Sequence, residues 1–104
     1  MSSNLTFSNL TSERYACALY ELAQESSELD QTENEMKNLK ELLNTSSDFK
    51  NMVMNPTIGK NEQSRAISKI SEYLDFSKNF KKFLNLLTFK RRLFFLDKII
   101  DNFL

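Results

Sequence analysis

The sequence predicts an all-α protein, a compact bundle of six helices in a single domain. Glycine and proline occur once each in 104 residues, as Gly59 and Pro56, which disfavours sheets with tight hairpins. Apolar residues repeat at spacings of three and four along most of the chain, as they do in amphipathic helices. The length suits one domain, and 40% hydrophobic with 27% charged residues is typical of a folded globular protein.

A short N-terminal segment is expected to precede the first helix. Residues 1–10 read as a polar tail. The helix after it has Thr11 or Ser12 as N-cap, because either side-chain oxygen accepts a hydrogen bond from the first turn. This helix should end near Ser26.

The stretch RYACALYELA, residues 14–23, has more apolar surface than a surface helix needs. Its apolar side chains cover an arc of roughly 200° at 100° per residue. Part of that arc must be covered by the rest of the protein, and another part is available to a partner. The alternative is a central helix that several neighbours bury.

Two helices follow it. The second has an apolar stripe at alternating spacings and ends near Asn44; the stripe is made of Leu29, Thr32, Met36, Leu39 and Leu43. The third is short, is capped by Ser46 or Ser47, and buries Phe49, Met52 and Val53. The pair Asn55-Pro56 ends it, because a residue before proline avoids the helical region.

The second half of the chain predicts three more helices. The fourth begins at Asn61, and the residues of its inner face are Ala66, Ile67, Ile70, Tyr73 and Leu74. The fifth, capped by Asp75 or Ser77, buries Phe76, Phe80, Phe83, Leu84 and Leu87. The sixth begins between Arg92 and Leu96 and buries Leu96, Ile99, Ile100 and Phe103. Since residues 88–92, TFKRR, contain no breaker, one long bent helix is the alternative for the last two. All nine phenylalanines are expected to fill the core.

The composition offers little for catalysis. There is no histidine, and the single cysteine, Cys17, excludes an intrachain disulfide. The carboxylate pairs Glu25 with Glu28 and Glu33 with Glu35 are interpreted as solvated surface. We therefore expect no enzyme, no cofactor and no metal site, and a function that resides in surfaces.

Charge is unevenly distributed although the net charge is zero. Residues 1–62 carry ten acids and five bases, and residues 63–104 carry four acids and nine bases. The two halves should attract each other on folding. An alternative function, nucleic-acid binding, would use the basic residues Lys81, Lys82, Lys90, Arg91 and Arg92.

Three segments resemble one family in order and spacing. RYACALYELA is similar to the pattern RYAxALxxLA that opens the ATP synthase delta subunit, the oligomycin-sensitivity-conferring protein family. Residues 54–67, MNPTIGKNEQSRAI, resemble its NPxIxxxEKxxxI segment, and residues 82–103, KFLNLLTFKRRLFFLDKIIDNF, resemble NFLxLLxxxGRLxLLxxIxxxF. Arg91 stands where that family has glycine, which leaves the turn type there open.

The resemblance implies the family's N-terminal domain, a six-helix bundle spanning residues 1–104, with no counterpart here of its C-terminal domain. It further implies a non-catalytic stator subunit that binds the N-terminal helix of an alpha subunit between the first and fifth helices. The missing C-terminal domain would meet the b subunit of the peripheral stalk. Expected localisation is the cytoplasmic face of a bacterial inner membrane, through the complex.

The same resemblance assigns the groove residues. From the first helix these are Tyr15, Ala18 and Leu22, and from the fifth Phe83, Leu86 and Leu87. The residues of the first helix expected to face the bundle are Ala16, Leu19, Tyr20 and Ala23. Arg14 and Lys90 are expected at the rim, where they would pair with acids of the partner.

Overall fold

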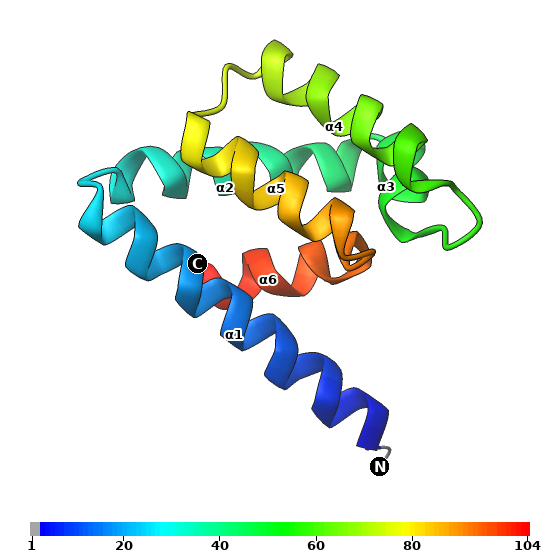
Figure 1. Cartoon of the computed structure of the whole chain (residues 1–104), viewed down its shortest axis with the longest axis horizontal. Coiled ribbons are helices and arrows are strands. Elements are labelled where there is room, and N and C mark those ends of the chain that lie inside the picture. Colours follow the sequence, from blue (N-terminus) through cyan, green and yellow to red (C-terminus); the bar gives the residue numbers. More distant parts are fainter. Residues whose placement is uncertain (1–2) are drawn as a thin grey trace.

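A computed structural model describes residues 3–104, with side chains from Leu10 onward. Within that range it has no strand. Its elements, shown in Figure 1, are α1 (Ser3–Glu25), α2 (Leu29–Thr45), α3 (Ser47–Met54), α4 (Lys60–Tyr73), α5 (Lys78–Phe89), the 3₁₀ turn η1 (Leu93–Phe95) and α6 (Leu96–Phe103). The predicted all-α bundle of six helices is confirmed.

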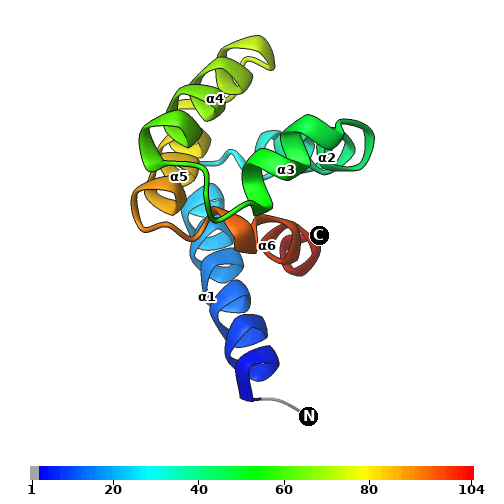
Figure 2. The same ribbon diagram turned by 90° about the vertical axis from the view of Figure 1, so that its right-hand side faces the viewer.

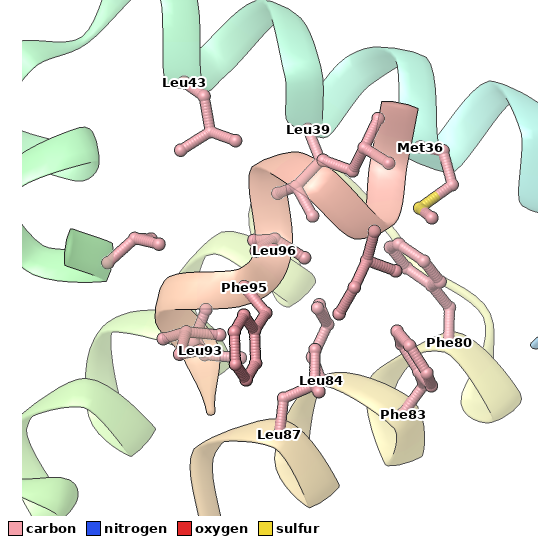
Figure 3. Close-up of a cluster of buried hydrophobic side chains, with 14 of the residues drawn as sticks. Met36, Leu39, Leu43, Phe80, Phe83, Leu84, Leu87, Leu93, Phe95 and Leu96 are labelled. Atoms are coloured by element: carbon pink, nitrogen blue, oxygen red, sulfur yellow. The ribbon is translucent and has the colours of Figure 1, made fainter. Parts of the chain in front are cut away.

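The short helix α6 lies at the centre of the bundle. Both α1 and α2 pack against it, and η1 leads directly into it (Figures 1 and 2). Leu96, Ile99 and Ile100 of α6 are completely buried. Figure 3 shows Leu96 between side chains of α2 and α5, among them Met36, Leu39, Phe80, Phe83 and Leu84.

One ion-pair cluster also joins α2 to α6. The ammonium of Lys40 donates hydrogen bonds to Asp97 at 2.6 Å and to Asp101 at 2.9 Å. These two bonds raise the pKa of Lys40. We expected acids of the first half to attract bases of the second half. In this contact the cation, Lys40, comes from the acidic half, and both carboxylates come from the basic half.

Helix α1 begins earlier than expected. We predicted a polar tail over residues 1–10 and a cap at Thr11 or Ser12, but the backbone is helical from Ser3. No glycine or proline interrupts this stretch, and each residue added to an existing helix gains one hydrogen bond. Ser12 is an interior, fully buried residue of α1 and not its cap. Met1 and Ser2 lie outside the described residues.

Two predicted N-caps are confirmed. The hydroxyl of Ser46 accepts from the Phe49 N–H at 3.2 Å, and the hydroxyl of Ser77 accepts from the Phe80 N–H at 3.2 Å. Asn55 is the C-cap of α3, as the following proline predicts.

Three aromatic residues in the second half of the chain are not where the pattern placed them. Tyr73, predicted on the inner face of α4, is 85% exposed, because α4 ends at this residue. Phe89 and Phe94 are also exposed, so the expectation that all nine phenylalanines fill the core is wrong.

Three helices end in a left-handed residue that is not glycine. These residues are Ser27 after α1, Asp75 after α4 and Arg91 after α5, with φ of 58°, 55° and 59°. After each one, the next N–H bonds back to the last helical turn, as Glu28 does to the Ala23 carbonyl at 2.8 Å. This is the Schellman pattern, in which glycine is the usual residue.

The corner between α5 and η1 is built in this way. The Arg92 N–H donates to the Leu87 carbonyl at 2.8 Å, and the Arg91 N–H to the Thr88 carbonyl at 3.1 Å. These bonds end α5, so the alternative of one long bent helix is wrong. Gly59 plays no part in such a turn, since it is the N-cap of α4 with φ −69°.

We predict that Ser27→Gly raises the free energy of unfolding by about 0.5–1 kcal/mol, because glycine adopts positive φ without steric cost. Ser27 is exposed, and its own side chain makes no hydrogen bond within the described part of the chain. Urea unfolding monitored by circular dichroism measures the change.

Arg91→Gly is the contrasting variant for this prediction. Its backbone gain is the same, but it removes three hydrogen bonds of the guanidinium group, so no net stabilisation is expected. Equal gains at both positions would contradict the assignment of a structural role to the Arg91 side chain.

Candidate functional site

The outer side of α1 presents small and apolar side chains. Ala16, Leu19 and Ala23 are buried against the core, whereas Ala18 and Leu22 are exposed and Tyr15 is half-buried. Tyr20, which we expected to face the bundle, is largely exposed, with its ring 5.8 Å from that of Phe103. The predicted apolar excess of α1 is therefore a surface strip beside the buried face.

Aromatic contact joins this strip to α5. The rings of Tyr15 and Phe83 meet edge to face, with centroids 6.3 Å apart. Leu86, on the next turn of α5, is 42% exposed and lies on the surface. Leu87 is 0% exposed and belongs to the core, so it supports the surface from below without lining it.

Arg92 closes one end of the strip. Its guanidinium donates to the Tyr15 hydroxyl at 2.8 Å and lies over the Tyr15 ring, 5.8 Å from the centroid. A hollow of about 330 Å³ opens here, and it is lined by Thr11, Arg14, Tyr15, Ala18 and Arg92. The structure thus brings the predicted rim residue Arg14 together with two groove residues.

Arg92, predicted as a binding residue only for the nucleic-acid alternative, was missed as a residue of this strip. Lys90, predicted at the rim, is the exposed C-cap of α5 and has no described contact with α1. The left-handed conformation of Arg91 turns the chain between them, so that position 92 and not position 90 reaches α1. The sequence signal was the GRL of the family pattern, in which glycine at position 91 indicates a left-handed turn and the arginine matches Arg92.

A polar link closes the other end. The side-chain amide of Asn79, in the first turn of α5, donates to the Ser26 hydroxyl at 3.2 Å and to the Glu28 carboxylate at 3.0 Å. Contacts at both ends of the strip thus link α1 and the turn after it to α5 and the turn after it. On α1, Ala18 and Leu22 lie between these links. Leu86 of α5 lies in the sequence between Phe83 and Arg92, the two residues that contact Tyr15.

The electrostatics of the described residues show no catalytic arrangement. No group of three potential metal ligands occurs among them. Cys17 is exposed, and its hydrogen bond to the Glu21 carboxylate raises the pKa of the thiol, which keeps it protonated and weakly nucleophilic.

Among the residues whose side chains the structure describes, Glu35 is the one buried carboxyl group, and its role is structural. It accepts hydrogen bonds from the Ser77 N–H and from the Ser77 hydroxyl, the latter at 3.2 Å, at the start of α5. Burial raises the pKa of Glu35, although the two bonds from Ser77 oppose that shift. The interpretation of Glu35 as solvated surface is wrong.

The basic residues of the second half do not form one free patch. The Arg91 guanidinium is bonded to the α3–α4 loop and that of Arg92 to Tyr15. Because Arg91 and Arg92 are held by different elements, the five residues of the nucleic-acid alternative, which also include Lys81, Lys82 and Lys90, do not form one patch, and the geometry gives that alternative no support. Over the described residues, no helix has the length and apolar character needed to cross a membrane.

Comparison with known proteins relates this chain to one family. Residues 11–104 match the family model of the ATP synthase delta (OSCP) subunit. The chain is 42% identical over 103 residues to the ATP synthase subunit delta of Pelagibacter ubique (strain HTCC1062), covering 99% of this chain and 56% of that relative. It is 35% identical over 104 residues to that of Rhodospirillum rubrum, covering 100% and 56%. The chain spans about half the length of the curated relatives it matches.

We predict that Glu35→Gln becomes increasingly more stable than the wild type as pH rises through the range in which Glu35 ionises. Because the pKa of Glu35 is raised in the folded state, the folded protein binds more protons in this pH range than the unfolded protein does. The free energy of unfolding of the wild type therefore falls as pH rises. Glutamine keeps an acceptor for the Ser77 N–H but carries no charge. Urea unfolding of both proteins between pH 4 and 8 measures the difference.

The matched control is Glu33→Gln, an exposed carboxylate on the same helix, which should show no comparable trend. If the gap between Glu35→Gln and wild type shrank as pH rose, the charge of Glu35 would be stabilising α5 and our sign would be incorrect.

Proposed function

Because the chain belongs to the ATP synthase delta (OSCP) subunit family, we propose that it acts as a non-catalytic stator component of a proton-translocating ATP synthase. Residues 1–104 would form the N-terminal domain of that subunit, which fits a chain that matches about half of its relatives. The domain would help to hold the catalytic head still while the central rotor turns.

The partner proposed for the strip between α1 and α5 is the N-terminal helix of an alpha subunit. The observation that carries this proposal is the exposed set of Ala18, Leu22 and Leu86 between two links that join α1 to α5. Such a surface suits an amphipathic helix, whose apolar side chains would cover it. Tyr15 and Phe83 would form the floor, with Leu87 beneath them.

Each groove residue has a distinct contribution. The methyl group of Ala18 permits close approach of a partner backbone, while Leu22 and Leu86 provide apolar area worth about 25 cal/mol per Å² on burial. Arg14 and Arg92, at the Tyr15 end, and Lys90 would meet acids of the partner. Such rim charges set orientation and association rate more than affinity.

The mechanism is mechanical. A stator must resist torque, which requires slow dissociation and a rigid support, and in related complexes affinity differences lie mostly in the dissociation rate. Helix α1 is suited to this because its inner face is held by α6. A preformed surface confines the ordering cost to the partner. The subunit's C-terminal domain would contact the b subunit of the peripheral stalk. As part of the complex, the domain would lie at the cytoplasmic face of a bacterial inner membrane.

The first test is binding of a synthetic peptide with the N-terminal sequence of the cognate alpha subunit. We expect a one-to-one complex by titration calorimetry, with amide shifts on α1 and α5. Ala18→Asp should weaken it by about 2 kcal/mol or more, since a carboxylate would be buried unpaired; that is roughly 30-fold in Kd.

Asn38→Asp is the control for added charge, because Asn38 is exposed on α2, away from the strip. It should bind the peptide as the wild type does. Ala18 is exposed, so Ala18→Asp should lower the free energy of unfolding only by about 1 kcal/mol or less, the difference in helix propensity. Unchanged affinity of the folded Ala18→Asp protein would refute the groove assignment.

A further inference from the structure

A second hollow lies away from the α1–α5 strip. It opens where the end of α3, the α3–α4 loop and the turn after α5 meet, at the right of Figure 1, and has a volume of about 450 Å³. None of its lining residues belongs to the strip. Its volume is within the range of sites that hold compact ligands, about 300–1,000 Å³.

The hollow is apolar inside and partly open to solvent. Val53 and Leu93 are buried and form its floor, whereas Met54 and Phe94 line it with 46% and 48% of their surface exposed. Pro56 adds a further apolar side. A flexible methionine beside a ring adapts readily to an inserted side chain.

A fixed guanidinium stands at the edge of this apolar surface. Arg91 donates to the Ile58 carbonyl at 2.9 Å, to the Pro56 carbonyl at 3.3 Å and to the Gln63 side chain at 3.0 Å. Gln63 is buried and donates to the Met52 carbonyl at 3.1 Å. Arg91 is thereby held in place by neutral acceptors alone.

Within the described part of the chain, the charge of Arg91 has no counter-ion. Among the described residues no carboxylate forms an ion pair with it. Three of the five guanidinium donors are used within the fold, which leaves two for a ligand. A carboxylate beside an arginine of fixed geometry forms a strong, charge-assisted contact.

We propose that this hollow is a second docking site, for a segment of a protein partner that carries a bulky apolar side chain next to a carboxylate. The apolar side chain enters between Met54 and Phe94, and the carboxylate binds Arg91. Charge complementarity selects this partner, since a neutral or basic segment leaves Arg91 without a counter-ion. The proposal does not depend on the function assigned to the strip.

Three capped dipeptides test it by amide-shift titration of the 104-residue protein. Acetyl-phenylalanyl-glutamate amide should shift the signals of Met54, Gln63, Arg91 and Phe94, with saturation in the millimolar range expected of so small a ligand. Acetyl-phenylalanyl-glutamine amide should bind there about 3-fold or more weakly, and acetyl-alanyl-glutamate amide should cause no saturable shift.

Two variants separate the charge from the apolar contact. Arg91→Gly keeps a residue suited to positive φ and should abolish the preference for glutamate over glutamine. Phe94→Ser should abolish binding of both phenylalanyl dipeptides. Tyr73→Ser, at a site 85% exposed and outside the hollow, should bind as the wild type does.

Any of three results would overturn the proposal: no saturable shift at these four residues, equal affinity for the glutamate and glutamine dipeptides, or unchanged discrimination in Arg91→Gly. Thermal unfolding of each variant establishes that it is folded. If Arg91→Gly did not fold, the two phenylalanyl dipeptides and Phe94→Ser would still decide the question.

Discussion

The burial of α6 is the contact on which the rest of the structure depends. Three side chains of this short helix, Leu96, Ile99 and Ile100, are completely removed from water. Burying side chains of this kind is worth about 1.5–3 kcal/mol each, a large share of the stability of a small domain. Helices α1 and α2 both pack against α6, and their contact with each other is smaller than the contact of either with α6. The hydrogen bonds from Lys40 to Asp97 and Asp101 add directional polar bonds between α2 and α6 to this apolar contact.

The proposed docking strip is a consequence of that central helix. Because α6 covers one face of α1, the adjoining face with Ala18 and Leu22 stays at the surface. Helix α5 reaches α1 through Tyr15 and Phe83 and through the polar link at Asn79, and its backbone does not close over the strip. Because no described helix covers the outer side of α1, this helix keeps an apolar surface that is supported from within by α6.

The scarcity of glycine accounts for the second notable feature, the role of position 91. The turn after α5 needs a left-handed residue, and arginine there is strained relative to glycine. Its guanidinium offsets part of this strain by three hydrogen bonds that tie the turn to the α3–α4 loop. The same turn sends Arg92 toward α1, so two neighbouring arginines serve two different surfaces.

Sequence by itself determined the six helices apart from the start of α1, two candidates for each cap of α3 and α5, the stop before Pro56 and the buried face of α5, because these depend on contacts within a few residues. Its motifs also identified the family, and the periodicity of RYACALYELA located an apolar excess on α1. Tertiary structure alone decided how that excess is divided, that Leu87 belongs to the core and does not line the groove, and that Arg92 and not Lys90 contacts Tyr15. It also decided that Phe94 stays exposed and that Glu35 is buried. These outcomes depend on which helices lie side by side and on one left-handed residue at position 91, and neither is encoded in local spacing.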